Sequence, residues 1–184
     1  MEIKITTKQM LTVLYVLSWI IFIGLCIEAG GFIFNGFLSL FVNTNDAKYF
    51  WQLIDLSDLY KYDRGYFIVT ILIIIIVAVL KAFLFYLIVK ILYDKKLTLS
   101  RPFNTDVRRF ISNLSYLALG IGVFSLVGFK YAEWFVKQGV NMPDAQHMRI
   151  AGADVWLLMG VILLVIAQIF KRGIELQQEN DLTV

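Results

Sequence analysis

The sequence predicts an all-α membrane protein, a four-transmembrane-helix bundle with a small ordered extracytoplasmic cap. Of the 184 residues, 59% are hydrophobic and only 17% are charged, whereas soluble domains are near half apolar and about a quarter charged. The apolar residues are concentrated in blocks such as residues 68–80, which only Thr70 interrupts. A membrane-spanning helix needs about 20 such residues, so the blocks have the length of transmembrane helices.

Polar segments divide the chain into four helices within one integral membrane domain. The first helix follows a polar head that ends at Gln9, and the apolar pattern continues beyond Gly30. Pro102 forbids a regular helix in the connector before the third helix, for which Thr105 or Asp106 is the expected N-cap. The helices are expected at about residues 10–41, 66–93, 106–136 and 153–176.

Lysine and arginine are distributed unevenly between the two ends of the predicted helices. The richer side is expected to be cytoplasmic, because positive residues accumulate in cytoplasmic loops. This places both termini in the cytoplasm. The richer side carries Lys4, Lys8, Lys90, Lys95, Lys96, Arg101, Arg108, Arg109, Lys171 and Arg172, and the other carries Lys48, Lys61, Arg64, Lys130, Lys137 and Arg149.

The segment Asn43–Gly65 is expected to form the cap. It is rich in aromatic residues, including Tyr49, Phe50 and Trp51, and exposed apolar patches of that size are unfavourable in water. Its alternating pattern from Trp51 to Ser57 suits a short strand or an interfacial segment. We expect this segment to be ordered and packed at the headgroup level or against the second outer loop, Gly139–Gly152.

Two ionisable residues, Glu28 and Lys81, fall inside predicted spans. A charge at the bilayer centre costs about 2.5–3.5 kcal/mol on insertion scales. With a rise of about 1.5 Å per residue, both lie within roughly 4 Å of the midplane. We therefore predict an intramembrane charge pair. Its role can be structural, fixing helix register, or functional, as a proton or ion site; a snorkelling lysine is the other structural alternative.

No catalytic constellation is predicted, and we expect a protein that is not an enzyme and has no cofactor. His147 is the only histidine and Cys26 the only cysteine, so we expect no metal site. Asp55, Asp58 and Asp63 are interleaved with basic residues and resemble a solvated surface rather than a calcium loop.

The basic connector and the acidic tail are the remaining candidates for binding. The connector is expected to contact membrane lipid, since basic residues beside a membrane attract anionic headgroups. A sharper alternative is that connector and tail together contact a cytoplasmic protein partner; direct nucleic-acid binding is not expected. The candidate residues are Lys95, Lys96, Arg101, Arg108 and Arg109 of the connector and Glu175, Glu179 and Asp181 of the tail.

The C-terminal sequence Glu-Asn-Asp-Leu-Thr-Val, residues 179–184, resembles the end of a bacterial four-helix membrane family, domain-of-unknown-function family 2975. The connector Arg-Pro-Phe-Asn-Thr-Asp-Val, residues 101–107, resembles that family's Pro-Phe connector. The resemblance implies the four-helix layout, a location in the bacterial cytoplasmic (inner) membrane and no enzymatic activity. Because genes of the family often neighbour a Cro-like regulator, it also implies a membrane regulator or partner of a small cytoplasmic helix-turn-helix regulator. The alternatives are an accessory subunit of a larger membrane complex, which would bind other membrane protein subunits, and a small transporter or ligand sensor.

Overall fold

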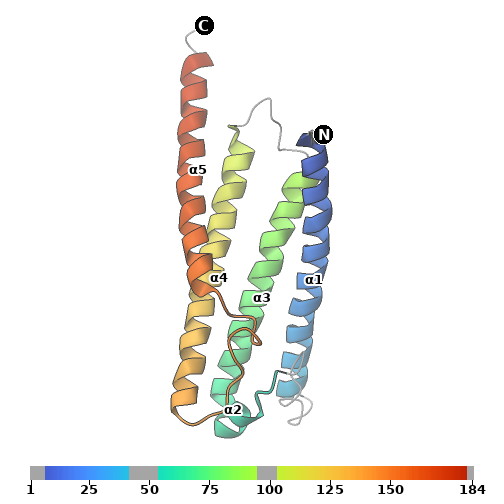
Figure 1. The fold of residues 1–184 in the computed structure, drawn as a ribbon, viewed down its shortest axis with the longest axis vertical. Helices are drawn as coiled ribbons and strands as arrows, with labels where there is room; N and C mark the ends of the chain where they lie inside the picture. Colours follow the sequence, from blue (N-terminus) through green and yellow to red (C-terminus); the bar gives the residue numbers. More distant parts are fainter. Residues whose placement is uncertain (1–6, 42–53, 95–102, 182–184) are drawn as a thin grey trace, which may run out of the picture.

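The computed structural model describes residues 7–41, 54–94 and 103–181, which are helical apart from the turns between helices and contain no β-strand (Figure 1). Four long helices are each long and apolar enough to cross a membrane. The predicted all-α membrane bundle is therefore confirmed. The helices are α1 (Thr7–Phe41), the short α2 (Ser57–Tyr62), α3 (Arg64–Tyr93), α4 (Thr105–Lys137) and α5 (Ala153–Asp181).

Three local features differ from the sequence-based expectation. The segment after Leu56 forms the helix α2 instead of continuing as a strand. Asn104 caps α4, where its side-chain oxygen accepts a hydrogen bond from the backbone N–H of Val107 at 2.8 Å. The helix α5 continues to Asp181, past the expected end near residue 176, so that the polar tail prolongs the membrane helix.

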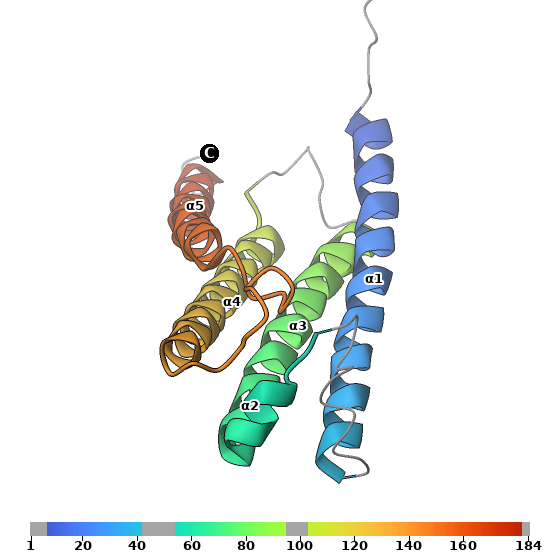
Figure 2. The same ribbon diagram turned by 60° about the horizontal axis from the view of Figure 1, so that its bottom comes forward.

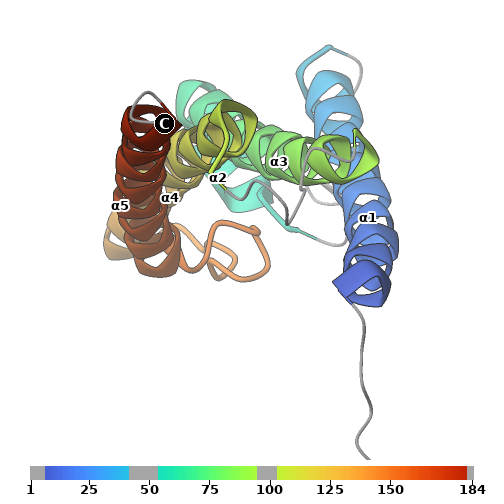
Figure 3. The ribbon, with the colours of Figure 1, turned by 90° about the horizontal axis from the view of Figure 1, so that it is seen from above.

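The long helices pack in chain order, α1 on α3, α3 on α4 and α4 on α5. Viewed from above, α1 and α5 lie at opposite ends of the row, with α3 and α4 between them (Figure 3). Within the described ranges α1 has its extensive helix contact with α3. A contact that joins α1 to another part of the protein would therefore help to fix the position of α1.

The α4–α5 contact depends on two glycines that face leucines of the other helix. A Cβ atom on Gly122 would lie 2.7 Å from Cγ of Leu157, and one on Gly160 would lie 2.6 Å from Cγ of Leu119. The hydroxyl of Ser115 also donates a hydrogen bond to the Gly160 carbonyl at 2.8 Å. This is the close backbone approach that small residues allow between membrane helices.

The Pro-Phe connector ends in a residue that anchors α4 to α5. Phe103 packs its ring on Phe170 with a centroid distance of 5.3 Å. It also occupies the space above Gly173, where a Cβ would meet Phe103 Cδ1 at 2.6 Å. The phenylalanine therefore fixes the start of α4 against the point where α5 leaves the apolar span.

The described part of the cap forms a folded layer where α3 begins and α4 ends. Leu56 and Leu59 are fully buried, and they belong to one core cluster with Val140, Met148 and Ile150 of the second loop. The remainder of the predicted cap, residues 43–53, lies outside the described residues. The aromatic ring of Phe135 is surrounded at the same end by the rings of Tyr62, Tyr66, Tyr131 and Trp134.

Candidate functional site

The loop between α4 and α5, residues 138–152, begins with a helix-terminating turn at Gly139. This residue has φ 82°, a left-handed conformation that glycine adopts without steric cost. The backbone N–H of Gly139 donates to the Val136 carbonyl at 3.0 Å, and that of Val140 donates to the Phe135 carbonyl at 3.1 Å. These two bonds form the Schellman motif that ends many helices, and buried Val140 supplies its hydrophobic contact.

The same turn pattern recurs further along the loop, with Arg149 in the place of the glycine. The N–H of Arg149 donates to the Gln146 carbonyl and the N–H of Ile150 donates to the Ala145 carbonyl, both at 3.0 Å. Arg149 has φ 60°. Left-handed backbone at a residue with a Cβ costs roughly 1–2 kcal/mol, so the position favours glycine on conformational grounds. An arginine there indicates that its side chain has a role.

Asp144 and His147 stabilise this second turn. The carboxylate of Asp144 accepts a hydrogen bond from the backbone N–H of His147 at 2.7 Å and contacts the ring Nδ1 at 2.8 Å. These hydrogen bonds, with that from the backbone first, lower the pKa of the Asp144 carboxyl. The lone histidine therefore belongs to a loop turn.

The loop does not stay at the end of the bundle, because its second half returns between the helices. Ile150 is 2% exposed and lies at the surface of Gly128 in α4, beside Ile73 of α3. The helix α5 accordingly begins at about the middle of α4 (Figures 1 and 2). Non-helical backbone at such a depth is tolerated where protein buries it, and the burial of Met148 and Ile150 meets that condition.

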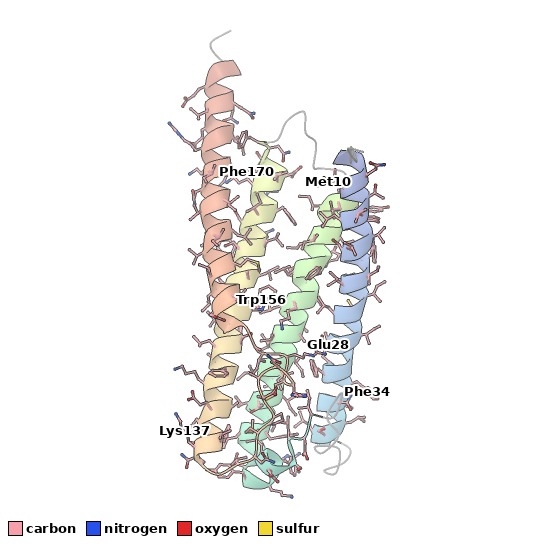
Figure 4. All side chains as sticks on the ribbon, in the orientation of Figure 1. Met10, Glu28, Phe34, Lys137, Trp156 and Phe170 are labelled. Carbon is pink, nitrogen blue, oxygen red and sulfur yellow. The ribbon has the colours of Figure 1, made fainter. Side chains whose placement is uncertain are left out.

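This return brings Arg149 to Glu28 of α1, which lies at mid-height in the structure (Figure 4). The Nε atom of Arg149 lies 2.9 Å from Oε1 of Glu28, and the two side chains are 54% and 19% exposed. That carboxylate oxygen is shielded from solvent, and the contact is an ion pair without the alignment of a hydrogen bond. Arg149 therefore supplies a link from α1 to the loop that leads into α5.

Lys81 of α3 joins the cluster through the backbone of the same residue. Its Nζ donates a hydrogen bond to the Arg149 carbonyl at 2.7 Å and lies 5.9 Å from the ring centroid of Trp156 in α5. The ammonium thus holds the strained turn in place, and the aromatic ring provides a weak additional attraction for the cation. We call Glu28, Lys81, Arg149 and Trp156 the charge cluster; its residues come from α1, α3, the loop and α5.

Glu28 and Lys81 were predicted as a direct pair, and the structure places both in the charge cluster. The ion pair shown for Glu28, however, is with Arg149, and Lys81 hydrogen-bonds to that residue's carbonyl. The physical reason is competition: the loop supplies a guanidinium that the sequence had placed outside the bundle. Both charges then have partners, which lowers the cost of holding them at that depth.

The cluster contains one carboxylate and two cations, so its chemistry is electrostatic. It can hold α1 against the loop, and an added anion that competes for the guanidinium would weaken that attachment. Among the described residues, no group of three or more His, Cys, Asp and Glu side chains gathers in a way that could hold a metal ion.

The described members of the other predicted set lie in the first turns of α4 and the last turns of α5. Arg108 is half-buried and Arg109 is exposed. Glu175 forms ion pairs within α5, at 3.2 Å to Arg172 and 4.0 Å to Lys171. Glu179 is exposed on the same helix, and Asp181 is the last residue of α5. Lys95, Lys96 and Arg101 lie outside the described residues.

Sequence reasoning missed Arg149, which it counted as an outer-loop charge. The signal that could have found it is the apolar pair Met148 and Ile150 on either side of the arginine, since two buried residues in a polar loop indicate that the loop enters the core. Sequence reasoning also missed Trp156, whose ring faces the ammonium of Lys81.

The fold defines a multi-pass α-helical membrane protein with a charge cluster inside the helix bundle. The chain belongs to the family described as protein of unknown function (DUF2975), whose model matches residues 51–184. This match confirms the family membership that the tail and the connector indicated. No curated protein and no solved structure matches the chain.

Proposed function

We propose that this protein is a non-enzymatic regulator of the bacterial inner membrane that holds a small cytoplasmic helix-turn-helix protein. The observation that supports this function is the polar extension of α5. The last turns of the helix pass beyond the ends of the other helices (Figure 1). A rigid helix of this kind presents side chains to the aqueous phase at a fixed distance from the membrane.

The surface of this extension combines an apolar contact with charges. Leu176 is 46% exposed in a polar stretch, beside a shallow depression lined by Phe103, Ile169 and Gly173. Glu179 adds negative charge next to it, and Glu175 contributes a carboxylate that is paired with Lys171 and Arg172. Helix-turn-helix proteins are basic where they bind DNA, so an acidic helix with an apolar anchor is complementary to them and would compete with DNA.

The proposal requires both termini to be cytoplasmic, as the distribution of lysine and arginine predicts. In a Cys26→Ser background, Asn141→Cys is expected to react with a membrane-impermeant maleimide from outside intact cells. Thr183→Cys is expected to react only after the cells are opened. Equal labelling of the two positions from outside would contradict the topology.

Site-specific photo-crosslinking from Leu176 in native membranes tests the proposed partner. We expect the crosslinker at this position to give an adduct with a helix-turn-helix protein. A crosslinker at Leu158, which is 63% exposed in the apolar part of the same helix, is the matched control and should give lipid adducts only. Adducts with integral membrane subunits at both positions would instead support an accessory subunit, and lipid adducts alone at Leu176 would contradict the proposal.

A second candidate function, a small transporter or ligand sensor, is favoured by the charge cluster. Ionisable residues within a membrane bundle often mark ion or proton pathways. Proton flux into proteoliposomes that disappears on Glu28→Gln would favour this function over the regulator.

A further inference from the structure

A cleft lies between the last turns of α3 and the first turns of α4, at the end of the bundle where these helices meet the connector. Leu87, Lys90 and Asp94 line it from α3, and Asp106, Arg109 and Phe110 line it from α4. Lys90, Asp94, Asp106 and Arg109 are exposed, and Leu87 and Phe110 are half-buried. The cleft therefore combines two cations, two anions and an apolar wall.

The order of the charges along the bundle is the same on both helices. In α3, Lys90 comes one turn before Asp94, about 6 Å deeper, because α3 runs toward this end. In α4, Arg109 comes after Asp106, about 4.5 Å deeper, because α4 runs away from this end. The cations thus form a layer nearer the apolar middle of the bundle, and the anions form a layer outside it.

Lys90 is directed toward the deeper layer. Its Nζ lies 6.0 Å from the ring centroid of Tyr86, which precedes it by one helical turn, whereas Asp94 follows it by one turn. The ammonium is therefore directed toward the apolar part of α3 and away from Asp94.

We propose that this cleft binds the headgroup of a zwitterionic aminophospholipid. The phosphate of such a lipid is attached to the glycerol, next to the acyl chains, and its ammonium is two carbons further out. Lys90 and Arg109 are placed to bind the phosphate, and Asp94 and Asp106 are placed to bind the ammonium. Leu87 and Phe110 contact the first carbons of the acyl chains. This headgroup makes charge-assisted hydrogen bonds through both its phosphate and its ammonium, whereas a headgroup that carries only negative charge makes them through the phosphate alone.

The test uses the full-length protein, stripped of lipid in detergent and titrated under native mass spectrometry. The probes are phosphatidylethanolamine, phosphatidylglycerol and phosphatidylcholine with identical acyl chains. We expect phosphatidylethanolamine to bind at least about fivefold more tightly than either of the others, since each pairing is a charge-assisted bond. Phosphatidylcholine is the informative control because its quaternary ammonium cannot donate hydrogen bonds.

Two double variants test the anion layer and the cation layer separately. Asp94→Asn with Asp106→Asn should remove the preference for phosphatidylethanolamine and leave phosphatidylglycerol binding unchanged or stronger. Lys90→Gln with Arg109→Gln should weaken the binding of both lipids. Lys137→Gln with Glu133→Gln, an intrahelical pair of α4 at the other end of the bundle, is the matched control and should change the binding of neither lipid. Circular dichroism checks that the variants keep their helices, and Asp94→Asn alone should shift the preference in the same direction by a smaller factor.

Several results would overturn the assignment. One is binding of phosphatidylglycerol as tight as that of phosphatidylethanolamine in the unsubstituted protein, and another is an unchanged preference in the double aspartate variant. Soluble phosphoethanolamine should compete poorly, because it makes no contact with Leu87 and Phe110. If it displaces the lipid at equal concentration, the cleft is a site for a free small molecule and the lipid assignment is wrong.

Discussion

Gly122→Ala is expected to lower the free energy of unfolding by about 2 kcal/mol, within the range of about 1–3 kcal/mol for overpacking a core. The new Cβ would lie 2.7 Å from Cγ of Leu157 and 2.9 Å from its backbone nitrogen. A side chain can rotate away, but the backbone of α5 must move. Gly160→Ala is expected to have a similar effect, since its Cβ would lie 3.0 Å from the backbone nitrogen of Leu119. The free energy of unfolding of both variants can be measured in mixed detergent micelles.

Gly120→Ala is the matched control, two residues earlier on the same helix. Its Cβ would lie 3.5 Å from Cδ1 of Leu80, an ordinary contact. Because alanine has the higher helix propensity, this variant should be as stable as the unsubstituted protein or more stable. If Gly122→Ala is as stable as Gly120→Ala, the close α4–α5 contact is wrong.

Glu28→Gln is expected to lower the free energy of unfolding by about 2 kcal/mol. Breaking a fully buried ion pair costs about 3–5 kcal/mol because an unpaired charge remains, and the smaller value reflects the 54% exposure of the Arg149 side chain. The loss should be larger in bilayers than in detergent, where water reaches the arginine more easily. Equal stability of Glu28→Gln and the unsubstituted protein in both environments would contradict the role assigned to this carboxylate.

Much of the fold follows from local sequence properties. The apolar blocks predicted α3 at residues 66–93, and the helix observed is Arg64–Tyr93. The family was likewise evident from the tail and the connector. The physical reason is that a spanning helix must satisfy its backbone internally and bury an apolar surface in lipid, so its signal lies in consecutive residues.

The position of the α4–α5 loop could not be predicted in the same way. The return of the loop depends on Ile150 fitting against Gly128, a contact between residues distant in sequence. Sequence rules also argue against left-handed backbone at a residue such as Arg149. The charge cluster was therefore predicted in part: the cost of burying charge selected Glu28 and Lys81, and the third charged residue came from a segment assigned to solvent.

The ion pair between Glu28 and Arg149 joins α1 to the loop before α5, and double-mutant cycles for the unfolding free energy in bilayers measure its strength. Arg149→Gln keeps the carbonyl that Lys81 binds, so a Glu28→Gln cycle with it isolates the ion pair. We predict a coupling of about 1–2 kcal/mol in this cycle, larger than the coupling in the corresponding cycle with Lys81→Met. Negligible coupling between Glu28 and Arg149, with the coupling transferred to Lys81, would contradict this ion pair and would restore the direct pair predicted from sequence.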